Sequence, residues 1–185
     1  MMKAIVNDSF GGPEVMRVAS VPEPTPGPGQ VLVKVVATSV NRPDVIQRQG
    51  NYPPPPGDSN ILGLEIAGTV AALGDGVDQW RCGDRVMGLV GGGAYAEFSV
   101  AWPGHLMRIP ESMNWEKAAC VSETYITAHL NLFQFPGLLD GQQVLLHGGG
   151  GGVNTAAIQL CRALDPSVTI LVTASTAKVQ RVRDL

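Results

Sequence analysis

The sequence has few charged residues, few aromatic residues and few cysteines. Charged side chains make up 16% and aromatic ones 5% of the 185 residues, whereas hydrophobic residues make up 44%. A chain of this composition buries a core and does not stay disordered over a long stretch. The 13 basic and 16 acidic residues give a formal net charge of −3 without a basic stripe. The electrostatic signature of a nucleic-acid-binding protein is therefore missing.

Two further absences concern membranes and the redox compartment. The sequence has no run of 18 apolar residues, and its N-terminus lacks the apolar stretch of a secretory signal, so we expect no membrane association. Its three cysteines, Cys82, Cys120 and Cys161, lie far apart. They cannot form a disulfide framework or a four-thiolate zinc site. These features predict a cytoplasmic protein.

Glycine and proline are abundant, and they divide the first part of the chain into short segments. The run 22–29 is too rich in proline for a helix or a central strand, and it predicts a connecting loop. Around it lie short β-branched or alternating segments that predict strands. These are Lys3–Asn7, Val31–Thr38, Ile61–Leu73, Arg85–Met87 and Ala94–Val100.

After Pro110 the pattern changes to longer, alternating elements. A helix capped by Ser112 and a helix over 123–133 are followed by a strand within 141–148. Apolar residues then recur at helical spacing and precede a second strand over 168–173 and a helix from 178. These apolar residues are Val153, Ala156, Ala157, Leu160 and Leu164. The order β-α-β-α predicts the start of a parallel, doubly wound sheet.

A run of five glycines, 148–152, joins the first of these strands to the helix. In this context glycines let the backbone approach a pyrophosphate, and the free N–H groups of the helix start attract its charge. The predicted cofactor-binding residues here are Gly149, Gly150, Gly151, Gly152 and Val153. Asn154 stands where a third motif glycine is expected, so a merely flexible loop remains the alternative.

The end of the second strand bears on the choice of cofactor. An NAD-preferring fold places an acidic residue there to bind the ribose 2′-hydroxyl, but the segment 172–178 contains no acid. Ser175 and Lys178 instead offer a hydroxyl and an ammonium group to a 2′-phosphate, which favours NADPH. The alternative is that Ser175 only caps a helix and Lys178 is a surface residue.

Several segments in order resemble the zinc-independent quinone oxidoreductases of the medium-chain dehydrogenase/reductase superfamily, most of all their p53-inducible branch. They are 40–44, 47–57, 61–68, 83–86, 93–97 and 144–148. The resemblance implies an α/β protein with a GroES-like, mostly-β catalytic domain over 1–110. Connecting helices over 111–136 and the first part of a Rossmann NADP-binding domain over 137–185 follow, with an active site in the cleft between the domains.

The same resemblance implies site residues and a reaction. Asn41, Asp44 and Tyr52 are expected to line the substrate cleft, with Asn41 donating to a developing oxyanion and Asp44 orienting Asn41 or the cofactor. Thr127 matches a position near the nicotinamide. The implied reaction is reduction of a small-molecule quinone by NADPH. Judged as residues alone, Asn41 could instead be a turn residue and Asp44 a helix cap. Tyr52 could be a ring on the surface, and Thr127 a helical threonine that bonds back to a carbonyl.

Metal chemistry is not expected. In the superfamily's zinc enzymes a cysteine and a histidine hold the metal, but these places are taken here by Asn41 and by Leu64 beside Glu65. An amide and an alkyl group cannot replace a thiolate and an imidazole on zinc. The sequence therefore predicts no metal site.

Two other functions and one limit stay open. The chain could be a nucleotide-binding protein without turnover, or an enoyl or acyl reductase of the same superfamily. Only two strands of the Rossmann domain can be placed, whereas a complete one has six. We therefore expect the Rossmann domain to be truncated, the 185-residue chain alone to have weak activity, and a longer parent to form a homodimer.

Overall fold

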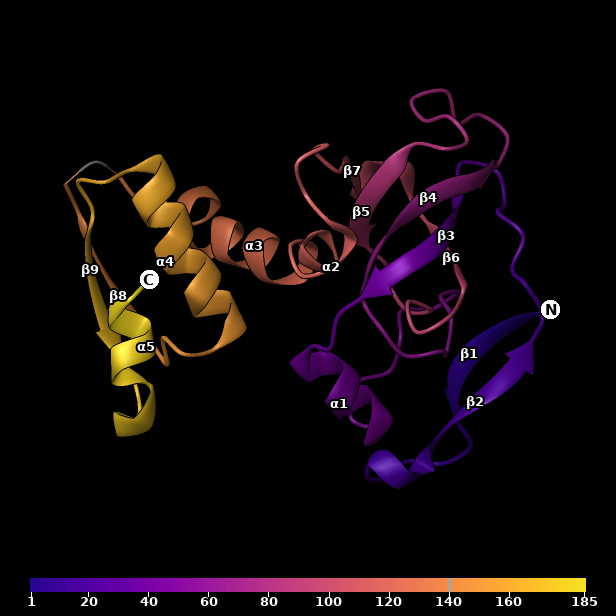
Figure 1. Cartoon of the computed structure of the whole chain (residues 1–185), viewed down its shortest axis with the longest axis horizontal. Helices are drawn as coiled ribbons and strands as arrows, with labels where there is room; N and C mark the ends of the chain where they lie inside the picture. Colours follow the sequence, from indigo (N-terminus) through magenta and orange to yellow (C-terminus); the bar gives the residue numbers. More distant parts are fainter. Residues whose placement is uncertain (140) are drawn as a thin grey trace. The chain divides into compact units, whose positions relative to one another are not determined.

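A computed structural model describes residues 1–139 and 141–185, which form two compact units, Met1–Ser122 and Glu123–Leu185 (Figure 1). The first unit is mostly β and the second is α/β, as the sequence predicts. Among the described residues, no helix has the length and apolar character needed to cross a membrane.

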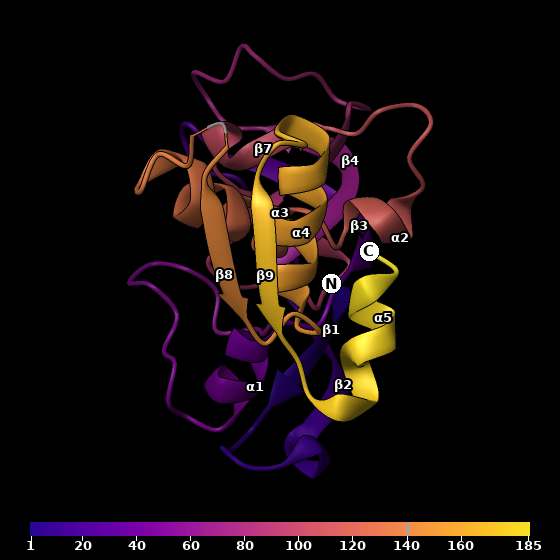
Figure 2. The ribbon, with the colours of Figure 1, turned by 90° about the vertical axis from the view of Figure 1, so that its left-hand side faces the viewer.

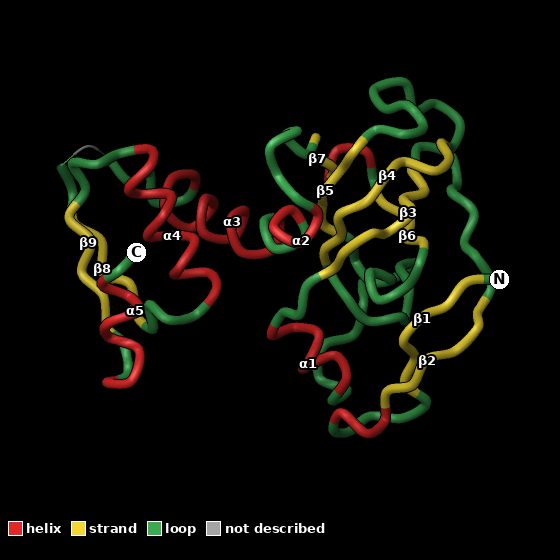
Figure 3. Tube along the Cα trace, in the orientation of Figure 1, coloured by secondary structure: helices red, strands yellow, loops and turns green. Residues whose placement is uncertain are grey.

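The first unit is built around an antiparallel sheet of five strands (Figure 3). Its order is β6 (Phe98–Ala101), β3 (Val31–Thr38), β4 (Glu65–Leu73), β5 (Arg85–Leu89) and β7 (Leu106–Arg108). Alternate β-branched residues of β3 and β4 face one core, in which Val31, Val33 and Ile66 are fully buried. The first three residues of β3 are all buried, and exposure alternates along the strand only from Lys34 on.

A separate hairpin-like pair, β1 (Met2–Asn7) and β2 (Met16–Val21), runs antiparallel beside this sheet. Strands β2 and β7 are not predicted from the sequence, because β2 buries none of its residues and β7 is only three residues long. Strand β6 begins at Phe98, so the predicted strand start at Ala94 is wrong. In the segment before β6, an isolated bridge joins Ala96 to Ala4, and Glu97 O accepts the N–H of Val35 in β3 at 2.9 Å.

Four short helical segments complete the first unit: 3-10 turns at Pro13–Val15 and Pro103–His105, α1 (Arg42–Arg48) and α2 (Trp115–Ala118). Helix α2 is capped by Asn114, whose side chain accepts the N–H of Lys117 at 3.0 Å. The predicted cap Ser112 is therefore wrong. It lies in a turn that is closed by a hydrogen bond from Met113 N to Pro110 O.

The second unit contains the predicted crossover. Strand β8 (Gln143–His147) leads into α4 (Gly152–Leu164), and β9 (Thr169–Thr173) returns parallel to β8. Figure 2 shows the two strands side by side and pointing the same way. Helix α3 (Ser122–His129) continues as a π-helical turn, Leu130–Gln134. A 3-10 turn, Thr176–Lys178, leads into α5 (Val179–Arg183).

One face of α4 forms the core of this unit. Ala156, Ala157 and Cys161 are buried and pack with Leu146 of β8 and with Val168. The predicted apolar stripe is correct in its middle and wrong at its ends. Val153, in the first turn of α4, is 38% exposed, and Leu164, at its last residue, is 59% exposed.

Candidate active site

The first group of predicted site residues lies at the start of α1. Asn41 is extended and caps the helix, and its backbone N–H donates to Asp44 Oδ2 at 2.7 Å. Asn41 and Asp44 together form a capping box, which satisfies N–H groups that the first helical turn leaves open. The structure therefore joins Asn41 and Asp44 directly as a helix cap, and an orienting role of Asp44 in a reaction stays a prediction.

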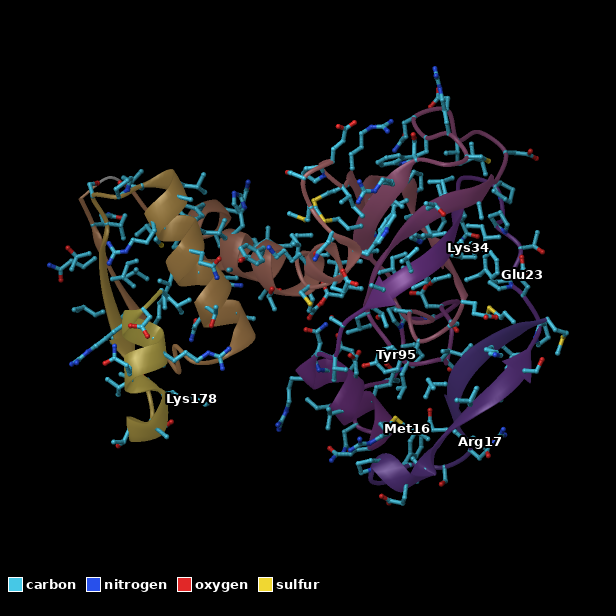
Figure 4. The ribbon with its side chains drawn as sticks, viewed as in Figure 1. Met16, Arg17, Glu23, Lys34, Tyr95 and Lys178 are labelled. Carbon is cyan, nitrogen blue, oxygen red and sulfur yellow. The ribbon has the colours of Figure 1, made fainter. Side chains whose placement is uncertain are left out.

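Asp44 is 2% exposed and has a second donor, the hydroxyl of Tyr95, at 2.9 Å from Oδ2 (Figure 4). Burial raises the pKa of Asp44. The two donated hydrogen bonds oppose this rise, and the negative charge of Glu65 adds to it. Burial and the neighbouring Asp44 also raise the pKa of Tyr95, which keeps the phenol neutral and able to donate. The sequence does not predict Tyr95 as a site residue, because it lies 51 positions from Asp44.

The side chain of Asn41 belongs to a second group, with Ser39 and Glu65. Asn41 Nδ2 donates to Ser39 Oγ at 2.9 Å and to Glu65 Oε1 at 2.8 Å. The Ser39 hydroxyl also donates to Glu65 Oε1, which closes a ring of three hydrogen bonds. Glu65 is 1% exposed, and its backbone carbonyl accepts from Thr38 Oγ1 at 2.8 Å.

This geometry does not suit a zinc ion. The Asn41 amide turns its N–H groups, which cannot bind a cation, toward Glu65 and Ser39. The neighbouring Leu64 offers only a buried alkyl group. Within residues 1–139 and 141–185, no group of three or more His, Cys, Asp and Glu side chains could hold a metal. The residues in the superfamily's zinc-ligand places therefore do not fit the metal.

Tyr52 lies apart from the two hydrogen-bonded groups. It is 44% exposed and lines a hollow of about 240 Å³ together with Phe10, Leu62 and Gln47, the last from the final turn of α1. Gln47 Oε1 is buried, and it has no hydrogen-bond partner among the described residues. The structure thus places Tyr52 near the other end of α1, with its ring available to a ligand.

The second predicted site, the glycine loop, follows β8. Gly148 has φ +83°, a conformation that favours glycine. The N–H groups of Gly148 and Gly149 donate to Thr173 O at 3.0 and 2.9 Å, which ties the loop to the end of β9. A Cβ on Gly149 would lie 2.2 Å from Val172 Cγ1. Glycine at 149 is therefore required for the close packing of loop and strand.

The remainder of the loop is more open. Gly151 caps α4, and a Cβ there would meet only Gly148 O, at 3.4 Å. Gly152 and Val153 are exposed in the first turn of α4, where N–H groups lack partners within the helix. These N–H groups and the positive end of the helix dipole make this turn suited to a phosphate.

Asn154 and Lys178 complete the surroundings of the loop. Asn154 Nδ2 donates to His147 O at 2.5 Å, so the residue in the third glycine place holds the helix to the end of β8. A Cβ on Gly150 would lie 2.6 Å from Lys178 Cδ, so the stem of Lys178 (labelled in Figure 4) lies against this glycine. Ser175 precedes that turn, and its carbonyl accepts the N–H of Lys178 at 2.8 Å.

Thr127 lies on the half-buried side of α3, and its backbone carbonyl accepts from Asn131 Nδ2 at 2.9 Å. One turn earlier, Thr124 reaches the glycine loop, because a Cβ on Gly152 would lie 3.1 Å from Thr124 Cγ2. The structure brings the predicted cofactor residues Gly150 and Lys178 together, whereas the contact between Ser175 and Lys178 is a local backbone bond. The residue of α3 beside the loop is Thr124, which the sequence pattern does not single out.

Comparison with known protein families and sequences agrees with this architecture. The alcohol dehydrogenase GroES-like domain matches residues 27–111. The mouse "Synaptic vesicle membrane protein VAT-1 homolog-like" is 38% identical over 99% of this chain and 44% of its own length. A quinone oxidoreductase from Lama guanicoe is 38% identical over 98% of this chain and 55% of its own length.

Solved structures give the same picture. The human VAT-1 homolog-like protein superposes with a TM-score of 0.91 at 37% identity, over 99% of this chain and 59% of that one. A mycobacterial quinone oxidoreductase gives a TM-score of 0.87 at 35% identity, over 100% of this chain and 56% of that one. A mycobacterial structure complexed with NADPH also matches, with a TM-score of 0.87 at 35% identity, over 100% of this chain and 55% of that one.

The fold and these relatives define a GroES-like domain followed by a parallel β-α-β crossover. Residues 27–111 match the GroES-like domain of the alcohol dehydrogenases, and the chain's homologues include quinone oxidoreductases of the medium-chain dehydrogenase/reductase superfamily. The chain spans about half the length of the curated relatives it matches. Its place in the p53-inducible branch stays a prediction.

Proposed function

We propose that this chain contributes to an NADPH-dependent, zinc-independent quinone oxidoreductase. The observation that carries the proposal is the open turn Gly151–Val153 at the start of α4, which lies beside a lysine that covers Gly150. A helix N-terminus formed by glycines after a parallel strand is suited to a pyrophosphate. The match to a structure complexed with NADPH supports the same cofactor.

In this proposal the second unit holds the cofactor. Gly149 and Gly150 keep the backbone close to β9 and Lys178, and Gly151, Gly152 and Val153 present N–H groups to the pyrophosphate. Ser175 and Lys178 contact the 2′-phosphate, and Thr127 lies near the nicotinamide. NADPH supplies the hydride that reduces the quinone, and the protein orients the reactants and excludes water.

The first unit provides the proposed substrate residues. Tyr52 offers an exposed ring and hydroxyl to a quinone, either by stacking or as a hydrogen-bond donor. Asp44 and Asn41 form the frame at the start of α1 that fixes the surrounding backbone. Quinones accept hydride readily, so this site can work without a Lewis acid.

The experiment follows NADPH oxidation at 340 nm with and without a small p-quinone, using protein treated with a chelator. We expect quinone-dependent oxidation, no stoichiometric zinc by elemental analysis, and lower kcat in Tyr52→Phe without weaker NADPH binding. Because the chain spans about half the length of its relatives, the assay also includes a longer protein, as long as those relatives, that carries the same residues. Absence of quinone-dependent oxidation in both proteins, or activity that depends on bound zinc, would contradict the proposal.

A second candidate is reduction of an enoyl thioester. Two enoyl reductase structures match this chain with TM-scores of 0.89 at 26% identity. Turnover of a crotonyl thioester without turnover of quinones would select it. NADPH binding without turnover of either substrate would select a non-catalytic nucleotide-binding role.

A further inference from the structure

The segment that follows β1 presents an exposed aromatic ring in a fixed place. Phe10 is 71% exposed, and its neighbour Gly11 is tied to Arg48 at the end of α1 in both directions. Gly11 N donates to Arg48 O at 3.2 Å, and Arg48 Nε donates to Gly11 O at 3.1 Å. The ring lies on Gly50, because a Cβ there would be 2.8 Å from Phe10 Cγ. A ring held in this way loses less conformational freedom when it binds a ligand.

The Phe10 ring belongs to the hollow of about 240 Å³ that Tyr52, Gln47 and Leu62 also line. None of the described residues that line this hollow carries a charge. Its volume is below the range of about 300–1,000 Å³ that is typical of sites for drug-sized ligands, so a dinucleotide is too large for it. The hollow therefore suits a small, uncharged ring.

Gln47 adds a requirement for one hydrogen-bond donor on that ring. The residue is 5% exposed, and its Oε1 has no donor among the described residues. A buried acceptor without a donor is unfavourable, and a ligand hydroxyl that reaches Oε1 satisfies it. A ligand carbonyl oxygen cannot do so, because it is itself an acceptor.

We propose that Phe10, Tyr52 and Gln47 form a binding site for an uncharged ring that carries a hydroxyl group, the chemistry of the hydroquinone product. The inference rests on the proposed function, and it assigns Phe10 and Gln47 to the substrate site. The two aromatic rings contact the carbon skeleton of the ligand, and Gln47 Oε1 accepts its hydroxyl. An anionic ring is rejected, because it would lose water without gaining a cationic partner.

Ligand titrations followed by NMR of the isotope-labelled chain test this site without NADPH and without turnover. Under reducing, oxygen-free conditions, hydroquinone and 2,5-dihydroxybenzamide should shift the ring signals of Phe10 and Tyr52 in a saturable way. The anion 2,5-dihydroxybenzoate has nearly the shape of the amide and should bind at least about tenfold more weakly. The dimethyl ether of hydroquinone, which has no hydroxyl, should bind at least about threefold more weakly than hydroquinone. No saturable shift with hydroquinone, or equal affinities for the amide and the carboxylate, would overturn the proposal.

Two substitutions assign the contacts to individual side chains. Phe10→Ala should weaken hydroquinone binding at least about fivefold, whereas Phe135→Ala, at an exposed ring outside the hollow, should leave it unchanged. Gln47→Met has a similar length and removes the unpartnered oxygen, so it should abolish the preference for hydroquinone over the dimethyl ether without lowering the Tm. Wild-type affinity in Phe10→Ala, or a preference that persists in Gln47→Met, would overturn the proposal.

The outcome of these titrations is distinguishable from that of the proposed function. Saturable binding at Phe10 and Tyr52 without NADPH-dependent turnover would support the ring site and contradict the quinone oxidoreductase. Turnover of quinone without any shift at these two rings would support the oxidoreductase and overturn the ring site.

Discussion

At the scale of single residues, Tyr95 is one of the two donors that satisfy the buried carboxylate of Asp44. Its hydroxyl donates to Asp44 Oδ2, and Asp44 Oδ1 is buried without a partner among the described residues. Tyr95→Phe should lower the free energy of unfolding by about 1–3 kcal/mol, because it leaves a buried acceptor less satisfied. Urea denaturation measures the change. Tyr52→Phe, at an exposed ring, is the control, with an expected change below about 0.5 kcal/mol. Equal effects of the two substitutions would show that the Tyr95 hydroxyl contributes nothing.

Asp44 also predicts a dependence of stability on pH. Burial raises its pKa in the folded protein, so the folded state holds the proton more tightly than the unfolded chain. The stabilisation is complete below the unfolded pKa of about 3.9 and is lost as the pH rises through the folded pKa. Asp44→Asn keeps an oxygen acceptor but carries no charge. Relative to wild type, this variant should gain stability as the pH rises above about 4. A difference between the two proteins that stays constant from pH 3 to pH 8 would contradict this sign.

The sequence predicts some of these residues and misses others for a physical reason. Asn41 and Asp44 lie three positions apart, a spacing typical of a helix cap, so their direct contact is foreseeable. Ser39 is two positions before Asn41, but Glu65 and Tyr95 reach the same place only through the folding of β4 and the segment before β6. Such contacts between distant positions leave no local pattern in a single sequence.

At the scale of elements, the glycine loop contains glycines that are needed for two different reasons, close packing and the approach of a ligand. Gly149→Ala would place a Cβ 2.2 Å from Val172 Cγ1, whereas Gly151→Ala meets its nearest atom at 3.4 Å. We expect Gly149→Ala to lower the free energy of unfolding by about 1–3 kcal/mol through overpacking. Gly151→Ala should leave folding nearly unchanged but weaken NADPH binding, because its methyl group lies where the pyrophosphate is proposed to approach.

Denaturation and fluorescence titration of the same two variants check this pair of expectations. If the Gly151→Ala variant binds NADPH as tightly as wild type, Gly151 is not part of the cofactor site. A stable Gly149→Ala variant would show that β9 moves aside without cost. The strand-loop-helix order of this region is predictable from the sequence. Which glycine is needed for packing and which leaves the backbone open is not predictable, because it depends on where Val172 and Lys178 lie.

At the scale of the whole molecule, the sheets of the two units differ in how strongly they are protected against local opening. The first has a sheet of five strands with a fully buried core, whereas the second has two strands, and Leu145 and Leu171 are 54% and 49% exposed. Small sheets are marginally stable by themselves. Native-state hydrogen exchange should therefore show amides of β8 and β9 opening at lower free energy than those of β3 and β4. Equal protection in both sheets would contradict this ranking.

The central claim is that the glycine loop with Lys178 forms an NADPH site, and paired dissociation constants test it most directly. Fluorescence titration of NADPH and NADH should give tighter binding of NADPH by at least about tenfold, equivalent to about 1.4 kcal/mol. Lys178→Glu should remove or reverse this preference, and the control Arg181→Glu, on an exposed position of α5, should keep it. Equal affinities for the two cofactors, or a preference unchanged in Lys178→Glu, would contradict the account.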